Sequence, residues 1–202
     1  TRDIEKFQDK LVIGDAYRQG LGDQNAAAAA YEEALSYGTF SIAPLLQLVQ
    51  INLDDQAFEA ALGYLQRLTD LEETPEKKSK WLMSMAAVVQ DGLKDSKRAA
   101  VLFEELLDQD SSKLEAFEAL VGIRNQEGNI EEIESTYLRM IKRRQAQQED
   151  VKDKKVLFML HRNLGEIYHL DMKNTPRAIE QYELALSYHP THEATREKVA
   201  RL

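Results

Sequence analysis

Five segments of the chain share one spacing of apolar residues, a step of four followed by a step of three. Residues three and four positions apart lie on one face of an α-helix. The triplets are Ala27, Tyr31 and Ala34; Ala61, Leu65 and Leu68; Ala99, Phe103 and Leu106; Ile133, Tyr137 and Met140; and Ala178, Tyr182 and Ala185. Their first members are 34, 38, 34 and 45 residues apart. This recurrence predicts a row of helical hairpins in which neighbouring hairpins cover each other's apolar faces.

The last copy, FMLHRNLGEIYHLDMKNTPRAIEQYELALSYHP over 158–190, is the most complete. Leu164, Gly165 and Tyr168 share a face of its first helix, and a turn at 174–176 precedes the second, where we expect Thr175 to be the cap. The pattern L-G-x-x-Y, then A-x-x-x-Y-x-x-A and a closing Pro190, resembles the tetratricopeptide repeat. The resemblance implies an all-α, right-handed solenoid forming one domain over 1–202. Its units span about 3–38, 41–71, 75–110, 112–148 and 151–190, with a terminal helix at 192–202.

The earlier units vary around this pattern. In the first, Gly14 and Tyr17 match Gly165 and Tyr168. The corresponding pairs are Val49 and Asn52 in the second unit and Met85 and Val88 in the third. Thr74 is expected to cap the first helix of the third unit. The longer steps predict a longer turn at 91–95 and two extended helices around a turn near Glu149 and Asp150.

Composition limits the classes of function. The chain has 202 residues, 43% hydrophobic and 30% charged, with a formal charge of −9. That charge argues against nucleic acid as a partner, because such binding depends on Lys and Arg at the phosphates. The chain lacks cysteine, an apolar run long enough for a membrane span and a signal-peptide pattern. Because it begins without Met, we expect an excised segment or processed form, and its compartment stays open between cytoplasm and export.

The resemblance also implies a site, because in this family the first helices of successive units line a concave groove that holds extended or helical peptides. Carried over to this chain, the groove has an apolar centre and charged ends. Its expected residues are Leu11, Asp15, Arg18, Leu46, Gln50, Leu53, Leu82, Ala86, Val89, Glu118, Asn125, Arg162, Glu166 and His169. The alternative is that the apolar members pack against facing helices. The family's chaperone-binding clamp of Lys, Asn and Arg is absent, since Leu11, Asp15, Gln47, Ser79 and Met83 stand at those places.

Other polar groups offer little chemistry. Glu166 and His169, with His161 two turns earlier, have the spacing of part of a metal site, but a complete ligand set is missing, and the pair His189 and His192 fits helix ends. The basic run at 142–144 either receives an acidic partner or is a solvated surface paired with Glu131, Glu132 and Glu134. Neither a phosphate-binding glycine loop nor a nucleophile with its base can be assembled. We therefore expect no enzyme activity, cofactor or metal.

The sequence thus predicts a non-catalytic scaffold that binds a protein or peptide in its groove. The alternative is a structural segment of a larger repeat protein, as in a secretion or envelope assembly, or a self-associating module without a peptide ligand. The identity of the partner and the oligomeric state stay open.

Overall fold

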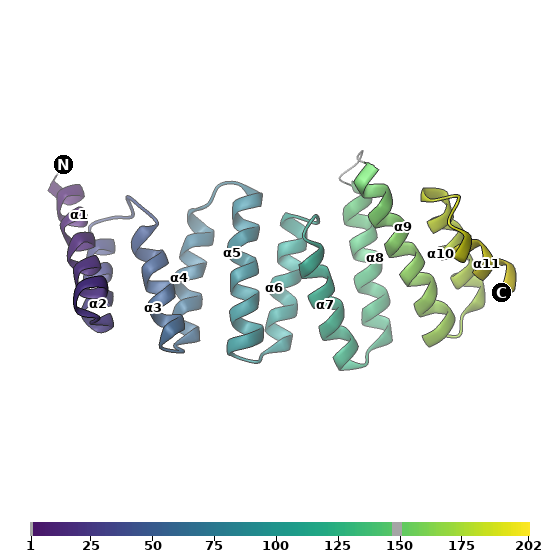
Figure 1. The fold of residues 1–202 in the computed structure, drawn as a ribbon, viewed down its shortest axis with the longest axis horizontal. Coiled ribbons are helices and arrows are strands. Elements are labelled where there is room, and N and C mark those ends of the chain that lie inside the picture. The colour runs from purple at the N-terminus through teal and green to yellow at the C-terminus, as the bar shows by residue number, and fades with distance from the viewer. Residues whose placement is uncertain (1, 147–150) are drawn as a thin grey trace. The chain divides into compact units, whose positions relative to one another are not determined.

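The computed structural model describes residues 2–146 and 151–202, and these residues form eleven α-helices and no strand (Figure 1). The chain divides into two compact bodies, the N-terminal body at 1–102 and the C-terminal body at 103–202. The predicted turn near Glu149 and Asp150 lies outside the described residues. No described helix has both the length and the apolar character to cross a membrane.

Successive helices within each body lie side by side and run in opposite directions (Figure 1). The N-terminal body contains α1 (Arg2–Asp15), α2 (Gln24–Ser36), α3 (Ala43–Asp54), α4 (Phe58–Leu71), α5 (Pro75–Ala87) and the start of α6 (Ser96–Gln109). The C-terminal body contains the rest of α6, then α7 (Leu114–Glu127), α8 (Ile130–Ala146), α9 (Val151–Glu166), α10 (Thr175–Tyr188) and α11 (Glu193–Arg201). The predicted all-α repeat of five hairpins and a terminal helix is confirmed in the described residues. That 1–202 acts as one domain stays a prediction.

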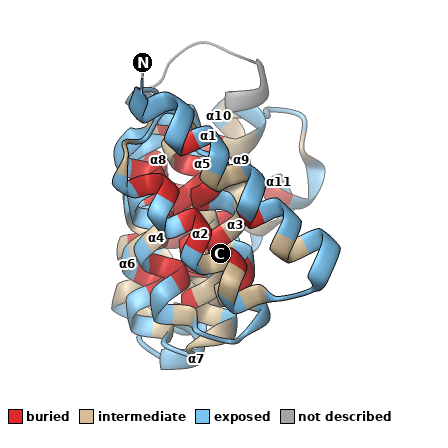
Figure 2. Ribbon diagram, turned by 90° about the vertical axis from the view of Figure 1, so that its left-hand side faces the viewer, coloured by how far each residue is buried: buried red, intermediate tan, exposed pale blue. Residues whose placement is uncertain are grey.

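The recurring triplets supply the core of each hairpin. Every triplet residue is buried, and none is more than 8% exposed. Figure 2 shows buried positions in stripes along the helices, with exposed positions on their other faces and on the turns. Glycine brings two helix pairs close together: a Cβ added to Gly14 would lie 2.5 Å from the ring of Tyr31, and one at Gly165 would lie 2.7 Å from the ring of Tyr182. Large rings therefore fill the space that the glycines leave.

Three first helices end in a π-helical turn, at Ala16–Leu21, Val88–Gly92 and Ile167–Asp171. After each turn a backbone N–H reaches back six residues, as from Asn174 to the carbonyl of Tyr168 at 2.7 Å. The α3–α4 turn is one residue shorter, since the N–H of Ala57 donates to the carbonyl of Asn52. A π turn thus accommodates an additional residue within a helix.

This turn corrects the predicted register of the third hairpin. The N–H of Asp95 donates to the carbonyl of Val89, as that of Asn174 does to Tyr168. Ala86 and Val89, rather than Met85 and Val88, therefore occupy the positions of Gly165 and Tyr168. Both are fully buried. The turn at 91–95 is one residue longer than the α3–α4 turn and as long as the turns after α1 and α9. The other additional residues of the 38-residue step therefore lie outside this turn.

Helix caps follow the expectation in part. Asp23 caps α2 by accepting a hydrogen bond from the N–H of Ala26 at 2.9 Å. The cap of α10 is Asn174, which accepts from the N–H of Arg177 at 3.2 Å, so the assignment to Thr175 is wrong. Thr74 precedes α5 but its side chain makes no cap hydrogen bond. An amide or carboxylate oxygen one residue before the helix is the better acceptor in these two turns.

Candidate functional site: the inner stripe of α9

One stripe of side chains runs along α9 and into the π-helical turn that follows it. Its members are Lys155, Met159, Arg162, Glu166 and His169, at alternating steps of four and three. Such steps keep side chains on one face of a helix. We call this set the α9 stripe. It contains the three predicted groove residues Arg162, Glu166 and His169. Lys155 and Met159 extend the same face toward the start of α9.

A first hollow lies between α7 and the N-terminal half of the stripe. Its volume is about 480 Å³, and it is lined by Leu114, Lys155, Val156, Phe158, Met159 and Arg162. Four of these side chains are apolar. Lys155 and Arg162 make no ion pair with any described residue. The hollow therefore offers an apolar surface beside two cations that form no ion pair within the described residues.

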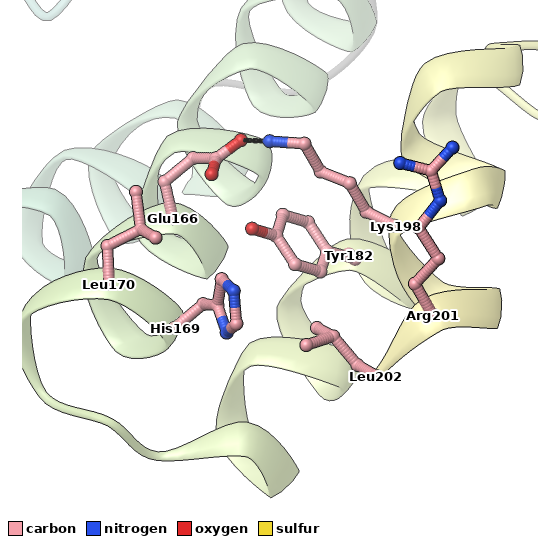
Figure 3. Close-up of a pocket in the computed structure, with 7 residues that line it drawn as sticks. All are labelled: Glu166, His169, Leu170, Tyr182, Lys198, Arg201 and Leu202. Atoms are coloured by element: carbon pink, nitrogen blue, oxygen red, sulfur yellow. Dashed lines mark hydrogen bonds and ion pairs between the residues drawn. The ribbon is translucent and has the colours of Figure 1, made fainter.

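A second hollow lies at the other end of the stripe, among α9, α10 and α11 (Figure 3). Its volume is about 290 Å³, and it is lined by Glu166, His169, Leu170, Tyr182, Lys198, Arg201 and Leu202. Glu166 forms an ion pair with Lys198, which comes from α11. The two predicted groove residues Glu166 and His169 are thus brought together in one hollow.

The charge of Glu166 is set by its surroundings. Burial alone would raise the pKa of Glu166, but the hydrogen bond and charge of Lys198 outweigh burial and hold the pKa below its ordinary value. A hydrogen bond from the Tyr182 hydroxyl and the charge of Arg162 act in the same direction. For the Tyr182 hydroxyl, burial first and then the negative Glu166 raise the pKa above its ordinary value. At neutral pH this hollow therefore holds an ionised carboxylate and a neutral phenol.

Six predicted groove residues of the N-terminal body lie on α1, α3 and the turn after α1. Asp15 accepts a hydrogen bond from the Tyr31 hydroxyl at 2.7 Å. Asp54 of α3 joins two of the predicted residues, since it lies 3.9 Å from the guanidinium of Arg18 and accepts from the Gln50 amide at 2.7 Å. The apolar members are surface residues to different degrees: Leu46 is exposed, while Leu11 and Leu53 are half-buried.

The residues predicted to form the apolar centre of the groove are buried and do not reach the surface. Leu82 is 2% exposed, and Ala86 and Val89 are fully buried. These three residues belong to the core of the third hairpin, because Ala86 and Val89 occupy the buried positions of Gly165 and Tyr168 and Leu82 lies one turn earlier on the same face. The alternative reading, in which they pack on facing helices, is the correct one for them. Asn125 and Glu118 of α7 are exposed, as a groove position requires.

The histidines outside the α9 stripe pack against neighbouring side chains of the fold. His161 is buried, its Nδ1 lies 2.8 Å from the Gln181 Oε1, and its ring stacks on Tyr188. Burial lowers the pKa of His161. His189 and His192 contact the ring of Phe158. In the part of the chain that the structure describes, no three His, Cys, Asp or Glu side chains gather as metal ligands.

The basic run on α8 has partners other than those predicted. Arg143 pairs with Glu104 and Asp108, both at 2.7 Å, and both acids come from α6 rather than from the start of α8. Arg139 also pairs with Glu104, at 2.7 Å. Arg144 is buried. Lys142 is exposed, and Arg143 is the residue of the run that links α8 to α6.

Several residues of the two hollows were missed in the sequence. Lys155 and Met159 continue the four-three steps of Arg162, Glu166 and His169 toward the start of α9, so extending that spacing would have found them. Lys198 and Arg201 follow no such rule, because their approach to α9 depends on how α11 packs in three dimensions.

Solved structures support the fold. A TPR repeats protein from Bacteroides fragilis is similar over 96% of this chain and 96% of its own, with 11% sequence identity and a TM-score of 0.60. This chain has a tetratricopeptide-type fold. The tetratricopeptide resemblance of the sequence and the all-helical structure agree with that assignment.

Two further structures resemble this tetratricopeptide-type chain more distantly. MamA residues 41 to the end, from Desulfovibrio magneticus RS-1, has 14% identity and a TM-score of 0.47, with 93% of this chain and 97% of that chain covered. YrrB, described as a TPR protein with an unusual peptide-binding site, has 14% identity and a TM-score of 0.44, with 96% and 91% covered. The sequence matches no protein-family model and no curated protein sequence.

Proposed function

We propose that this chain is a non-catalytic scaffold that binds a segment of a partner protein along the α9 stripe. The observation that carries the proposal is the first hollow, where an apolar surface of about 480 Å³ adjoins the cations Lys155 and Arg162. Ligand sites in proteins combine apolar lining with a few placed polar groups in hollows of roughly this size. An apolar side chain of the partner is the occupant that this lining favours.

The form of the partner follows from the stripe. Its five members extend from one hollow to the other along a single helix face, so an extended segment placed along them reaches both hollows. Recognition of a peptide in a groove works in this way, with apolar anchors supplying affinity and polar neighbours fixing register. Lys155 and Arg162 favour acidic residues beside the anchor, since neither forms an ion pair with a described residue.

A comparison of two substitutions tests this proposal. Met159→Asp places a charge in the first hollow, and Leu138→Asp places the same charge on an exposed position of α8 that lines neither hollow. We expect Met159→Asp to weaken capture of a partner by at least about tenfold and Leu138→Asp to leave it unchanged, because burying a charge against an apolar anchor is costly. Quantitative affinity capture with mass spectrometry, using extract of the source cells, provides the measurement.

Exposed Lys155 offers a second variant, because reversing its charge leaves the core untouched. Lys155→Glu should also weaken capture of the partner that Met159→Asp loses. Thermal melting of each variant distinguishes lost binding from lost folding. Equal recovery of every partner by wild type, Met159→Asp and Lys155→Glu would remove the α9 stripe as the binding surface.

Self-association or continuation into further repeats is the second candidate function. The observation that favours it is the exposure of apolar residues in the first hairpin, where Val12 is 67% and Leu21 is 75% exposed. Exposed apolar surface of this kind is covered in repeat proteins by a neighbouring repeat. Sedimentation over a range of concentrations separates the two candidates, since self-association predicts a mass that rises with concentration.

A further inference from the structure

A third hollow lies among the N-terminal half of α9, the end of α10 and the start of α11. Its volume is about 450 Å³, and it is lined by Lys154, Lys155, Phe158, Tyr188, His189 and His192. Two ammonium groups and two imidazoles border it, and none of the described residues that line it is acidic. In a chain with 35 acidic and 26 basic residues, this lining differs in charge from the chain as a whole. The hollow is thus suited to an anion.

The two imidazoles of the third hollow are held in place by their neighbours. The ring of Phe158 lies 5.3 Å from that of His189 and 4.7 Å from that of His192, measured between ring centroids. The two imidazoles lie 5.5 Å apart by the same measure. The N–H of His192 donates to the carbonyl of His189 at 3.2 Å, which fixes the turn between α10 and α11. Groups that are already positioned lose little freedom when a ligand binds.

His192 also has a defined tautomer. Its Nδ1 accepts a hydrogen bond from the N–H of Thr195 at 3.3 Å, which caps α11. A backbone N–H can only donate, so Nδ1 carries no proton and the proton of the neutral ring is on Nε2. This Nε2–H makes no hydrogen bond with a described residue, and Lys154 and Lys155 form no ion pair with one. Three side chains that line the hollow thus each keep a donor for a ligand.

A phosphate monoester matches these donors better than a carboxylate does. At pH 7 it carries a charge of about −1.5 to −2 and three acceptor oxygens, whereas a carboxylate carries one charge and two oxygens. The two lysines supply two positive charges, and no acid among the described lining residues offsets them. Lysine commonly binds phosphate in proteins as a point charge. The number of donors and the charge of the hollow therefore favour phosphate.

We propose that the third hollow binds a phosphorylated side chain of the partner segment. Lys154, Lys155 and the Nε2–H of His192 donate to the phosphate oxygens. The third hollow adjoins the first through Lys155 and Phe158, which line both. The phosphorylated residue therefore lies beside the apolar anchor of the segment, and no covalent bond is made or broken. This inference rests on the proposed function, because the segment is the one placed along the α9 stripe.

Small anionic probes test this site in the full chain. N-acetyl-O-phosphoserine amide carries a phosphate monoester, N-acetyl-glutamic acid α-amide carries a carboxylate, and inorganic phosphate carries no peptide group. With ¹³C-labelled histidine the chain has four reporters, of which His189 and His192 line the hollow and His169 does not.

At constant pH and ionic strength, we expect the phosphoserine probe to shift the His189 and His192 resonances saturably, with a Kd on the order of 1 mM for a ligand of this size. The glutamate probe should bind at least about threefold more weakly, because it brings less charge and fewer acceptors. Inorganic phosphate distinguishes a free ion from a phosphorylated side chain, and it should bind no more tightly than the phosphoserine probe.

Variants connect the binding to the lysine and imidazole donors. Lys154→Gln should weaken the phosphoserine probe about three- to tenfold, as loss of a charge-assisted hydrogen bond does. His192→Asn should weaken it by a similar factor and keep the cap of α11, because asparagine is a good N-cap residue but has no Nε2–H. Lys97→Gln, at an exposed lysine of α6, is the control and should have no effect. Thermal melting and an unchanged His169 resonance show that each variant is folded.

Three results would overturn the inference: a glutamate probe that binds as tightly as the phosphoserine probe, inorganic phosphate that binds more tightly than either, or shifts that rise without saturation. Unchanged phosphoserine binding by Lys154→Gln would also overturn it. This lysine is exposed, so its substitution leaves the core intact.

Partner capture from phosphatase-treated extract separates this inference from the proposed function. We expect the treatment to lower recovery of the partner that Met159→Asp loses. Unchanged recovery would overturn the inference and leave the proposed function standing. Saturable phosphoserine binding that depends on Lys154 supports the phosphate site even when no partner is captured, in which case the proposed function alone fails.

Discussion

At the scale of single residues, Tyr31 and Tyr182 fill the same position in two hairpins but their hydroxyl groups differ in partner. The ring of each packs against a glycine, and both are fully buried. The hydroxyl of Tyr31 donates a hydrogen bond to Asp15 at 2.7 Å, whereas the hydroxyl of Tyr182 shares Glu166 with Lys198. This difference gives a direct test of the side-chain arrangement around Glu166.

The test is a pair of substitutions that remove only the hydroxyl. Tyr31→Phe should lower the free energy of unfolding by about 1–2 kcal/mol, since a formed hydrogen bond is lost. Tyr182→Phe should lower it by less, under about 1 kcal/mol, since Glu166 keeps Lys198 as a partner when the hydroxyl is removed. Urea unfolding of both variants measures these values. Equal losses would show that the Tyr182 hydroxyl bonds Glu166 as firmly as the Tyr31 hydroxyl bonds Asp15.

The sequence predicts the core residues well and their register less well. The triplets around Tyr31, Phe103 and Tyr182 are correct because helical periodicity and burial describe the same face. The pair Ala86 and Val89 was displaced by one position, because additional residues were expected in the turn at 91–95, whereas that turn closes with the same backbone hydrogen bond as the turns after α1 and α9.

At the scale of elements, α6 and α8 are joined by an ion-pair network centred on Glu104. Its carboxylate accepts hydrogen bonds from Arg139 and Arg143, each at 2.7 Å. Burial alone would raise the pKa of Glu104, but these two hydrogen bonds and charges outweigh burial and hold the pKa below its ordinary value. A network with a shared, partly buried acid contributes more to stability than an isolated surface pair.

Glu104→Gln tests this network through its pH dependence. Because the folded pKa is depressed, the stability that Glu104 contributes is present above its unfolded pKa of about 4.3 and is lost as pH falls through the folded value. At pH 7 we expect the free energy of unfolding of the variant to be about 1–2 kcal/mol lower than that of wild type. The difference should shrink at pH 3. A difference of the same size at both pH values would contradict the account.

The sequence does not predict such pairings between helices. The acids that bind Arg143 lie 35 and 39 residues earlier in the chain, and nearer acids at the start of α8 fit the local i to i+4 rule better. Likewise, the pairing of Lys198 with Glu166 depends on how α11 packs against α9. Helix periodicity identifies faces but does not specify which charged ends meet across them.

At the scale of the whole molecule, the repeat of one hairpin explains both the fold and the placement of the candidate site. One hairpin cannot bury its apolar face alone, so its neighbours must cover it. The predicted groove residues at the centre, Leu82, Ala86 and Val89, take part in that covering. The residues of the α9 stripe remain at the surface of two hollows, which concentrates the proposed binding in the C-terminal body.

Site-specific photo-crosslinking tests the binding surface most directly. A photoreactive phenylalanine analogue replaces Met159 in the first hollow or Leu138 on the exposed face of α8, and irradiation in extract of the source cells is followed by mass spectrometry of the linked peptides. The account predicts that position 159 links to a defined segment of a partner protein and that position 138 does not. Links to the same segments from both positions, or links from position 138 alone, would contradict it.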